Sequence, residues 1–62
     1  MKPSSDHERE IARRVDALAI ENRLAPADLA QVVIAIPFPM SELETRFLIE
    51  YIAWRQRHPI KQ

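Results

Sequence analysis

The chain has 62 residues and a formal net charge of zero, and it contains neither cysteine nor glycine. A chain of this length forms a single domain that buries only about 60% of the surface exposed by its unfolded form, so its stability is low. The lack of cysteine excludes disulfides and thiolate metal sites, and the balanced charge predicts no sequence-independent attraction to nucleic acid or to anionic membranes.

Hydrophobic residues make up 47% of the chain, a content that argues against disorder. Residues 1–10 hold no apolar stretch of the kind found in secretory signals. The longest apolar run, residues 32–40, contains two prolines and is too short to cross a bilayer. We therefore expect a cytoplasmic protein with one helical domain over residues 1–62 and flexible tails at residues 1–4 and 59–62.

A first helix is predicted over residues 5–23. Ser5 with Glu8, or Asp6 alone, can cap its start. Pro26 disfavours helical geometry at the residue before it, so the helix should end near residue 23. The stripe that faces the core has helical spacing and comprises Ile11, Val15, Leu18 and Ala19. Three other apolar residues lie off that stripe, on nearly the opposite side: Ala17, Ile20 and Leu24.

A second helix is predicted over residues 26–36, with Pro26 at its first position, where the missing N–H is not needed. The alternative is a strand over residues 31–36, because valine and isoleucine favour strands. A strand needs a partner strand, and the chain has no second run of this composition, so we favour the helix. Ile34 lies outside its apolar side, which comprises Leu29, Val32, Val33 and Ile36.

Pro37 and Pro39 predict a rigid bend before a third helix. Both prolines fix φ and hold the residues before them outside the helical region. Phe38 lies between them and has two interpretations. It plugs the core at the bend, which we favour, or it is an exposed anchor for a partner.

The third helix is predicted over residues 41–57 and is the longest uninterrupted helical pattern in the chain. Ser41 and Glu44 have the spacing of a capping box, and Pro59 stops the helix by disfavouring helical geometry at His58. One apolar set spans about 80° of a helical wheel and comprises Leu43, Phe47, Tyr51 and Trp54. A second set spans about 100° beside it and comprises Leu48, Ile49 and Ile52.

Together these two sets cover about twice the arc of roughly 100° that is usual for a surface helix. Two neighbours must therefore cover the third helix, namely the rest of the chain and either a second copy or another protein. Tryptophan, tyrosine and arginine dominate binding hot spots. The alternative for Tyr51 and Trp54 is that they belong to the core. The side chains expected to contact a partner or a second copy are Phe38, Phe47, Tyr51, Trp54, Arg55 and Arg57.

Nothing in the sequence marks a catalytic, cofactor or metal site. Serine, histidine and acidic residues are present, but their spacing forms no complete catalytic constellation. His7 and Glu10 could provide two metal ligands, but a site needs more, so we interpret them as part of a solvated helix start. We therefore predict a protein that is not an enzyme and has no cofactor.

The sequence favours an all-α three-helix unit that forms a homodimer and regulates or inhibits another protein. The alternative is a small helix-turn-helix-like transcriptional regulator that binds DNA through residues 41–57. Glu42 and Glu44 oppose this alternative, because they would face the phosphates. Arg55, Arg57 and Lys61 could still contact a nucleic-acid backbone, so nucleic acid is the second and less favoured partner.

Overall fold

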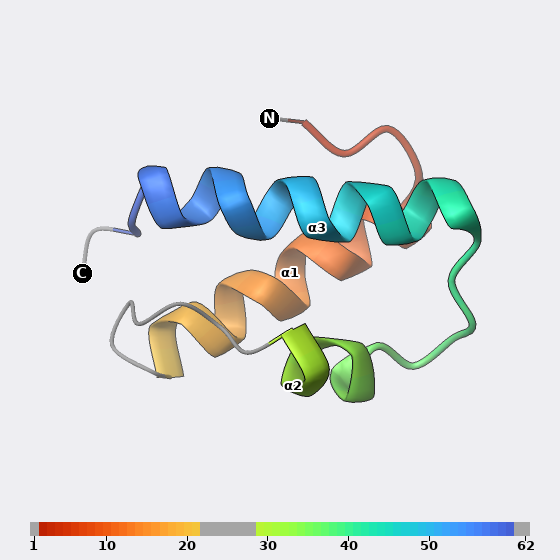
Figure 1. The fold of residues 1–62 in the computed structure, drawn as a ribbon, viewed down its shortest axis with the longest axis horizontal. Helices are drawn as coiled ribbons and strands as arrows, with labels where there is room; N and C mark the ends of the chain where they lie inside the picture. Colours follow the sequence, from red (N-terminus) through yellow and green to blue (C-terminus); the bar gives the residue numbers. More distant parts are fainter. Residues whose placement is uncertain (1, 22–28, 61–62) are drawn as a thin grey trace.

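A computed structural model of the chain describes residues 2–21 and 29–60. It contains three helices, α1 (Asp6–Glu21), α2 (Leu29–Ala35) and α3 (Glu42–Arg57), as Figure 1 shows. The all-α prediction is confirmed for these residues, which include no strand. The helical 29–35 segment rules out the strand alternative. The predicted end of the first helix and start of the second fall among residues 22–28, outside the described part of the chain.

The helix ends follow the capping chemistry that the sequence predicts. The Ser41 hydroxyl accepts from the Glu44 N–H at 3.2 Å, and the Glu44 carboxylate accepts from the Ser41 N–H at 2.8 Å, which completes a capping box. At α1, the Ser5 hydroxyl accepts from the Glu8 N–H at 3.1 Å, while the Glu8 carboxylate accepts from the N–H and hydroxyl of Ser4. At the far end, α3 stops at Arg57, two residues before Pro59, as predicted.

The three helices are arranged around α1. Figure 1 shows α3 lying obliquely across α1, with α2 below the middle of α1 in this view. Each of α2 and α3 packs more extensively against α1 than against the other. The buried core contains residues from all three segments: Ile11, Ala12, Val15, Val32, Ile36, Phe47, Leu48 and Tyr51.

The predicted core stripes of α1 and α2 are confirmed in part. Along α1 the predicted residues are buried except Leu18, which is half-buried, and the stripe also includes Ala12. Val33 was expected in the core but is 45% exposed, so that prediction is wrong. The reason is that Val32 turns its side chain into the core, and Val33, the next residue of α2, is rotated by about 100° from it. Ile34 lies off the core side, as predicted.

The chain covers more of the apolar arc of α3 than the sequence suggested. Phe47, Leu48 and Tyr51 are buried, and Ile52 and Trp54 are partly buried against the core. The covered arc is therefore about 160° wide. Two apolar residues at its opposite edges stay in contact with solvent, Leu43 at 71% exposure and Ile49 at 52%.

We predict that Leu48→Ala lowers the free energy of unfolding by about 2–5 kcal/mol, because it removes a fully buried side chain and leaves a cavity between helices. Leu43→Ala is the matched control, because Leu43 is an exposed leucine of the same helix, and it should change the free energy of unfolding by less than about 0.5 kcal/mol. Urea unfolding followed by circular dichroism measures both. Equal effects of the two substitutions would contradict this description of the core.

Candidate functional site

The structure distributes the six predicted contact residues over the core and the surface. Phe47 and Tyr51 are buried, Phe38 and Trp54 are partly buried against the core, Arg55 is half-buried and Arg57 is exposed. Because Phe47 and Tyr51 are buried within the single chain, little of either side chain is accessible to a partner. Phe38 packs against the core, as the favoured interpretation predicted.

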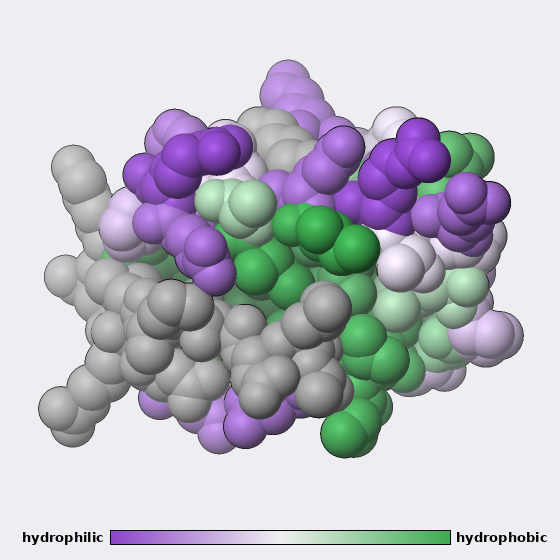
Figure 2. Space-filling model, viewed as in Figure 1, coloured by the Kyte–Doolittle hydropathy of each residue, from purple (hydrophilic) through white to green (hydrophobic). Residues whose placement is uncertain are grey.

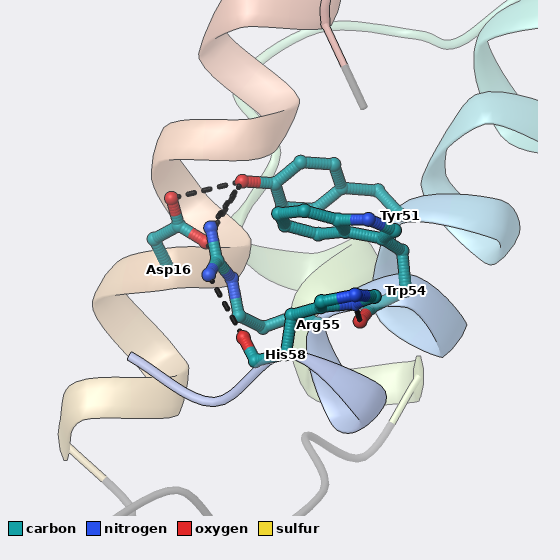
Figure 3. A network of polar contacts seen from close by, with 5 residues as sticks. All are labelled: Asp16, Tyr51, Trp54, Arg55 and His58. Atoms are coloured by element: carbon teal, nitrogen blue, oxygen red, sulfur yellow. Dashed lines mark hydrogen bonds and ion pairs between the residues drawn. The ribbon is translucent and has the colours of Figure 1, made fainter. Parts of the chain in front are cut away.

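The most extensive polar cluster joins α1 to the C-terminal half of α3 (Figure 3). The Tyr51 hydroxyl donates to the Asp16 carboxylate, at 2.9 and 3.0 Å from its two oxygens. The same hydroxyl accepts from Arg55 Nη2 at 2.9 Å, and Arg55 Nε donates to Asp16 Oδ1 at 2.9 Å. These three side chains form a closed triangle, which we call the Asp16–Tyr51–Arg55 clamp.

Aromatic rings extend the clamp to the end of α3. The Arg55 guanidinium carbon lies 4.6 Å from the centre of the Trp54 ring, within the range of a cation–π interaction. The His58 ring stacks on the same Trp54 ring, with 4.7 Å between the two centroids. Arg55 Nη1 also donates to the His58 carbonyl at 3.0 Å. Trp54 is thus fixed in place at the margin of the core.

The clamp shifts the ionisation of two of its members. Burial raises the pKa of Tyr51, and the hydrogen bond to Asp16 raises it further, against the opposing effect of Arg55. Desolvation acts to lower the pKa of Arg55, but the hydrogen bond with Tyr51 and the charge of Asp16 outweigh it, so this pKa is raised. At neutral pH the cluster therefore holds a neutral phenol, and a phenol whose pKa is raised is a poor general base.

The hydrogen bonds of the clamp are satisfied within the chain. Among the described residues, every buried side-chain nitrogen or oxygen atom has a partner. An internally satisfied cluster of this kind stabilises the packing of α3 on α1 rather than presenting a reactive group. In the described ranges 2–21 and 29–60, no three potential metal ligands come together.

A second polar contact fixes the other end of α3 to the start of α1. His7 Nδ1 lies 2.6 Å from Glu44 Oε2, and the His7 ring stacks on Phe38 at 3.9 Å between centroids. The pKa of Glu44 is lowered by the hydrogen bond from the Ser41 N–H and, less strongly, by His7, against the opposing effect of desolvation. Reasoning from the sequence could not find this contact, because His7 and Glu44 are 37 positions apart.

The metal-ligand alternative would require Glu10 to form a site with His7, but the Glu10 carboxylate is bound by two arginines instead. Its carboxylate accepts from Arg14 Nε at 2.6 Å and from Arg13 Nη2 at 2.8 Å, and these hydrogen bonds lower its pKa, that from Arg13 having the larger effect. The surface around these groups is an ordinary charged helix face.

Large apolar side chains remain exposed on every helix of the described chain. Figure 2 shows hydrophobic side chains gathered in a strip that runs from the middle of α3 down to α2. Around Ile49 the surface is hollowed into an open depression of about 710 Å³, lined by Met40, Glu42, Thr45, Arg46, Ile49 and Glu50. The exposed large apolar residues are Ile20, Val33, Ile34, Leu43 and Ile49. Of these, the sequence placed only Ile20 and Ile34 away from the core face.

Comparison of the chain with protein-family models, with curated proteins and with solved structures gave no match. In the part of the chain that the structure describes, none of the helices combines the length and the apolar character needed to cross a membrane.

We predict that the Tyr51 phenol titrates above its ordinary pKa of 10.0 in the folded protein. Because the folded state then holds this proton more tightly than the unfolded state, the associated stability is present below pH 10 and is lost as the pH rises through the folded-state pKa. Tyr51 is the only tyrosine, so the near-ultraviolet absorbance of tyrosinate reports its ionisation alone. The same chain unfolded in urea is the reference, and Tyr51→Phe should remove this part of the alkaline loss of stability. Titration of the folded chain at or below the unfolded value would contradict the clamp.

Proposed function

We propose that the protein is a non-enzymatic binding protein, acting as a homodimer, that regulates or inhibits another protein through exposed apolar side chains of α2 and α3. The observation that carries the proposal is the strip of apolar side chains from α3 to α2 (Figure 2), together with the exposure of Ile34 at 84% and Ile49 at 52% in a chain of 62 residues. Burial of one such side chain contributes about 1.5–3 kcal/mol. Contiguous exposed apolar surface is characteristic of interaction sites.

The polar chemistry of the chain is consistent with binding rather than catalysis. The hydrogen bonds of the clamp hold α3 to α1, and the Tyr51 phenol stays neutral at neutral pH. The depression around Ile49 is open and mixes apolar with charged side chains, as expected of a contact surface.

The DNA-binding alternative has less support. Arg55 belongs to the basic cluster that would contact phosphates, yet its guanidinium is engaged with Asp16, Tyr51 and the His58 carbonyl. The first turn of α3 carries Glu42 and Glu44. Measurement of binding to random duplex DNA at two salt concentrations separates the alternatives, since phosphate contacts weaken steeply as salt rises.

We predict that the double substitution Ile34→Ser with Ile49→Ser abolishes partner capture while the fold remains intact, because both side chains lie outside the core. The measurement is affinity capture from cells of the source organism, with mass spectrometry of proteins retained by the wild-type chain and by the variant. Ile20→Ser is the control, an exposed apolar residue on α1. It should retain the same protein as wild type. If wild type retains nothing that the double variant loses, the proposed function is wrong.

A further inference from the structure

We propose that α3 pairs antiparallel with α3 of a second copy of this chain, with Ile49 near the centre of the contact. This inference rests on the proposed function, because it uses part of the same exposed surface. It identifies one binding partner as a second copy of the chain. It also gives the relative orientation of the two α3 helices and the charged residues that favour this orientation.

The contact face is the side of α3 that points away from α1. Ile49 lies at the middle of this helix, which runs from Glu42 to Arg57. The exposed residues of this side fall within about 100° of a helical wheel. They are Glu42, Arg46, Ile49, Glu50, Ala53 and Arg57. An apolar centre is thus flanked by an acidic residue at one end and a basic residue at the other.

These charges distinguish two orientations of a symmetric pair. Glu42 and Arg57 each lie about 11 Å from the midpoint of α3, at a rise of about 1.5 Å per residue. In a parallel pair, like charges would face each other at both ends. In an antiparallel pair, Glu42 faces the partner's Arg57, and the two-fold symmetry repeats this contact. Arg46 then lies within about one helical turn of the partner's Glu50.

The charges on this face are only loosely used within the chain. Arg46 Nη2 lies 3.9 Å from Glu42 Oε1, and the two side chains are 65% and 91% exposed. A solvent-exposed pair at this distance contributes little to the stability of the single chain. Both groups can therefore reorient towards a second copy at small cost.

The apolar strip has the shape that this symmetry needs. Figure 2 shows it running from the middle of α3 towards α2, across the direction of α3. A two-fold axis that lies along such a strip makes the α3 helices of the two copies antiparallel. It also brings the strip of one copy into contact with the strip of the other. A stable interface covers about 800 Å² of each partner. The face of one helix is narrow for that area, so the exposed Val33 and Ile34 of α2 add to the contact.

The test uses charge substitutions at the two ends of α3. Sedimentation of the full chain gives the dimer dissociation constant for wild type, for E42R, for R57E and for the double variant. Each single variant brings like charges together at two symmetric positions, so its dissociation constant should rise about tenfold or more. The double variant restores both attractions and should return towards the wild-type value.

A mixture of the two single variants provides the second measurement. E42R carries positive charge at both ends of the face and R57E carries negative charge at both ends, so the two chains should form a heterodimer more tightly than either forms a homodimer. Both substitutions oppose the helix dipole. Recovery of assembly on mixing shows that a loss of helicity does not explain the weakening, and circular dichroism of each variant checks this directly.

Two outcomes would overturn this inference. Wild type that stays monomeric at high protein concentration excludes the pairing. A dimer whose dissociation constant is unchanged in both single variants excludes the antiparallel contact. A monomeric wild type would also remove the homodimer from the proposed function, whereas a dimer unchanged in both single variants would leave it in place. Whether the chain binds another protein is decided by the capture experiment, because E42R and R57E leave Ile34 and Ile49 unchanged.

Discussion

The packing of α3 on α1 is the contact on which the rest of the structure depends. Ile11, Val15 and Leu48 are almost completely buried, and they come from these two helices. The Asp16–Tyr51–Arg55 clamp adds directional hydrogen bonds at one end of the contact, and His7 with Glu44 adds another at the opposite end. Burial supplies most of the stabilisation, while the polar contacts at both ends fix how the helices lie.

This packing also determines what is left exposed. While α1 covers one broad side of α3, the described side chains of α2 and of the residue that follows it add Val32 and Ile36 to the core. Among the described side chains of α2 and α3, the large apolar residues that stay exposed are Val33, Ile34, Leu43 and Ile49. A chain of 62 residues has a high ratio of surface to volume, and association is a common way to cover such side chains. The proposed binding function follows from this shortage of covering surface.

Charge and apolar surface serve different purposes in this chain. Several charges of α1 are paired within the chain, as with Glu10 between Arg13 and Arg14. Those on the outer side of α3 surround an exposed isoleucine and are arranged with opposite signs at the two ends. In the proposed dimer, apolar contact would provide affinity, and the arrangement of charges would provide orientation.

The sequence by itself determined the local structure: three helices, the Ser41 capping box, the stop before Pro59 and the core stripe of α1. These features depend on residues within a few positions of one another, where helix periodicity and proline geometry act directly. Only the tertiary structure decided which apolar residues are covered, so that Val33, Leu43 and Ile49 are exposed while Phe47 and Tyr51 are buried. It alone paired Asp16 with Tyr51 and Arg55, which lie 35 and 39 positions further along the chain. The physical reason is that a helical wheel gives the angle between side chains but not the direction from which another helix approaches.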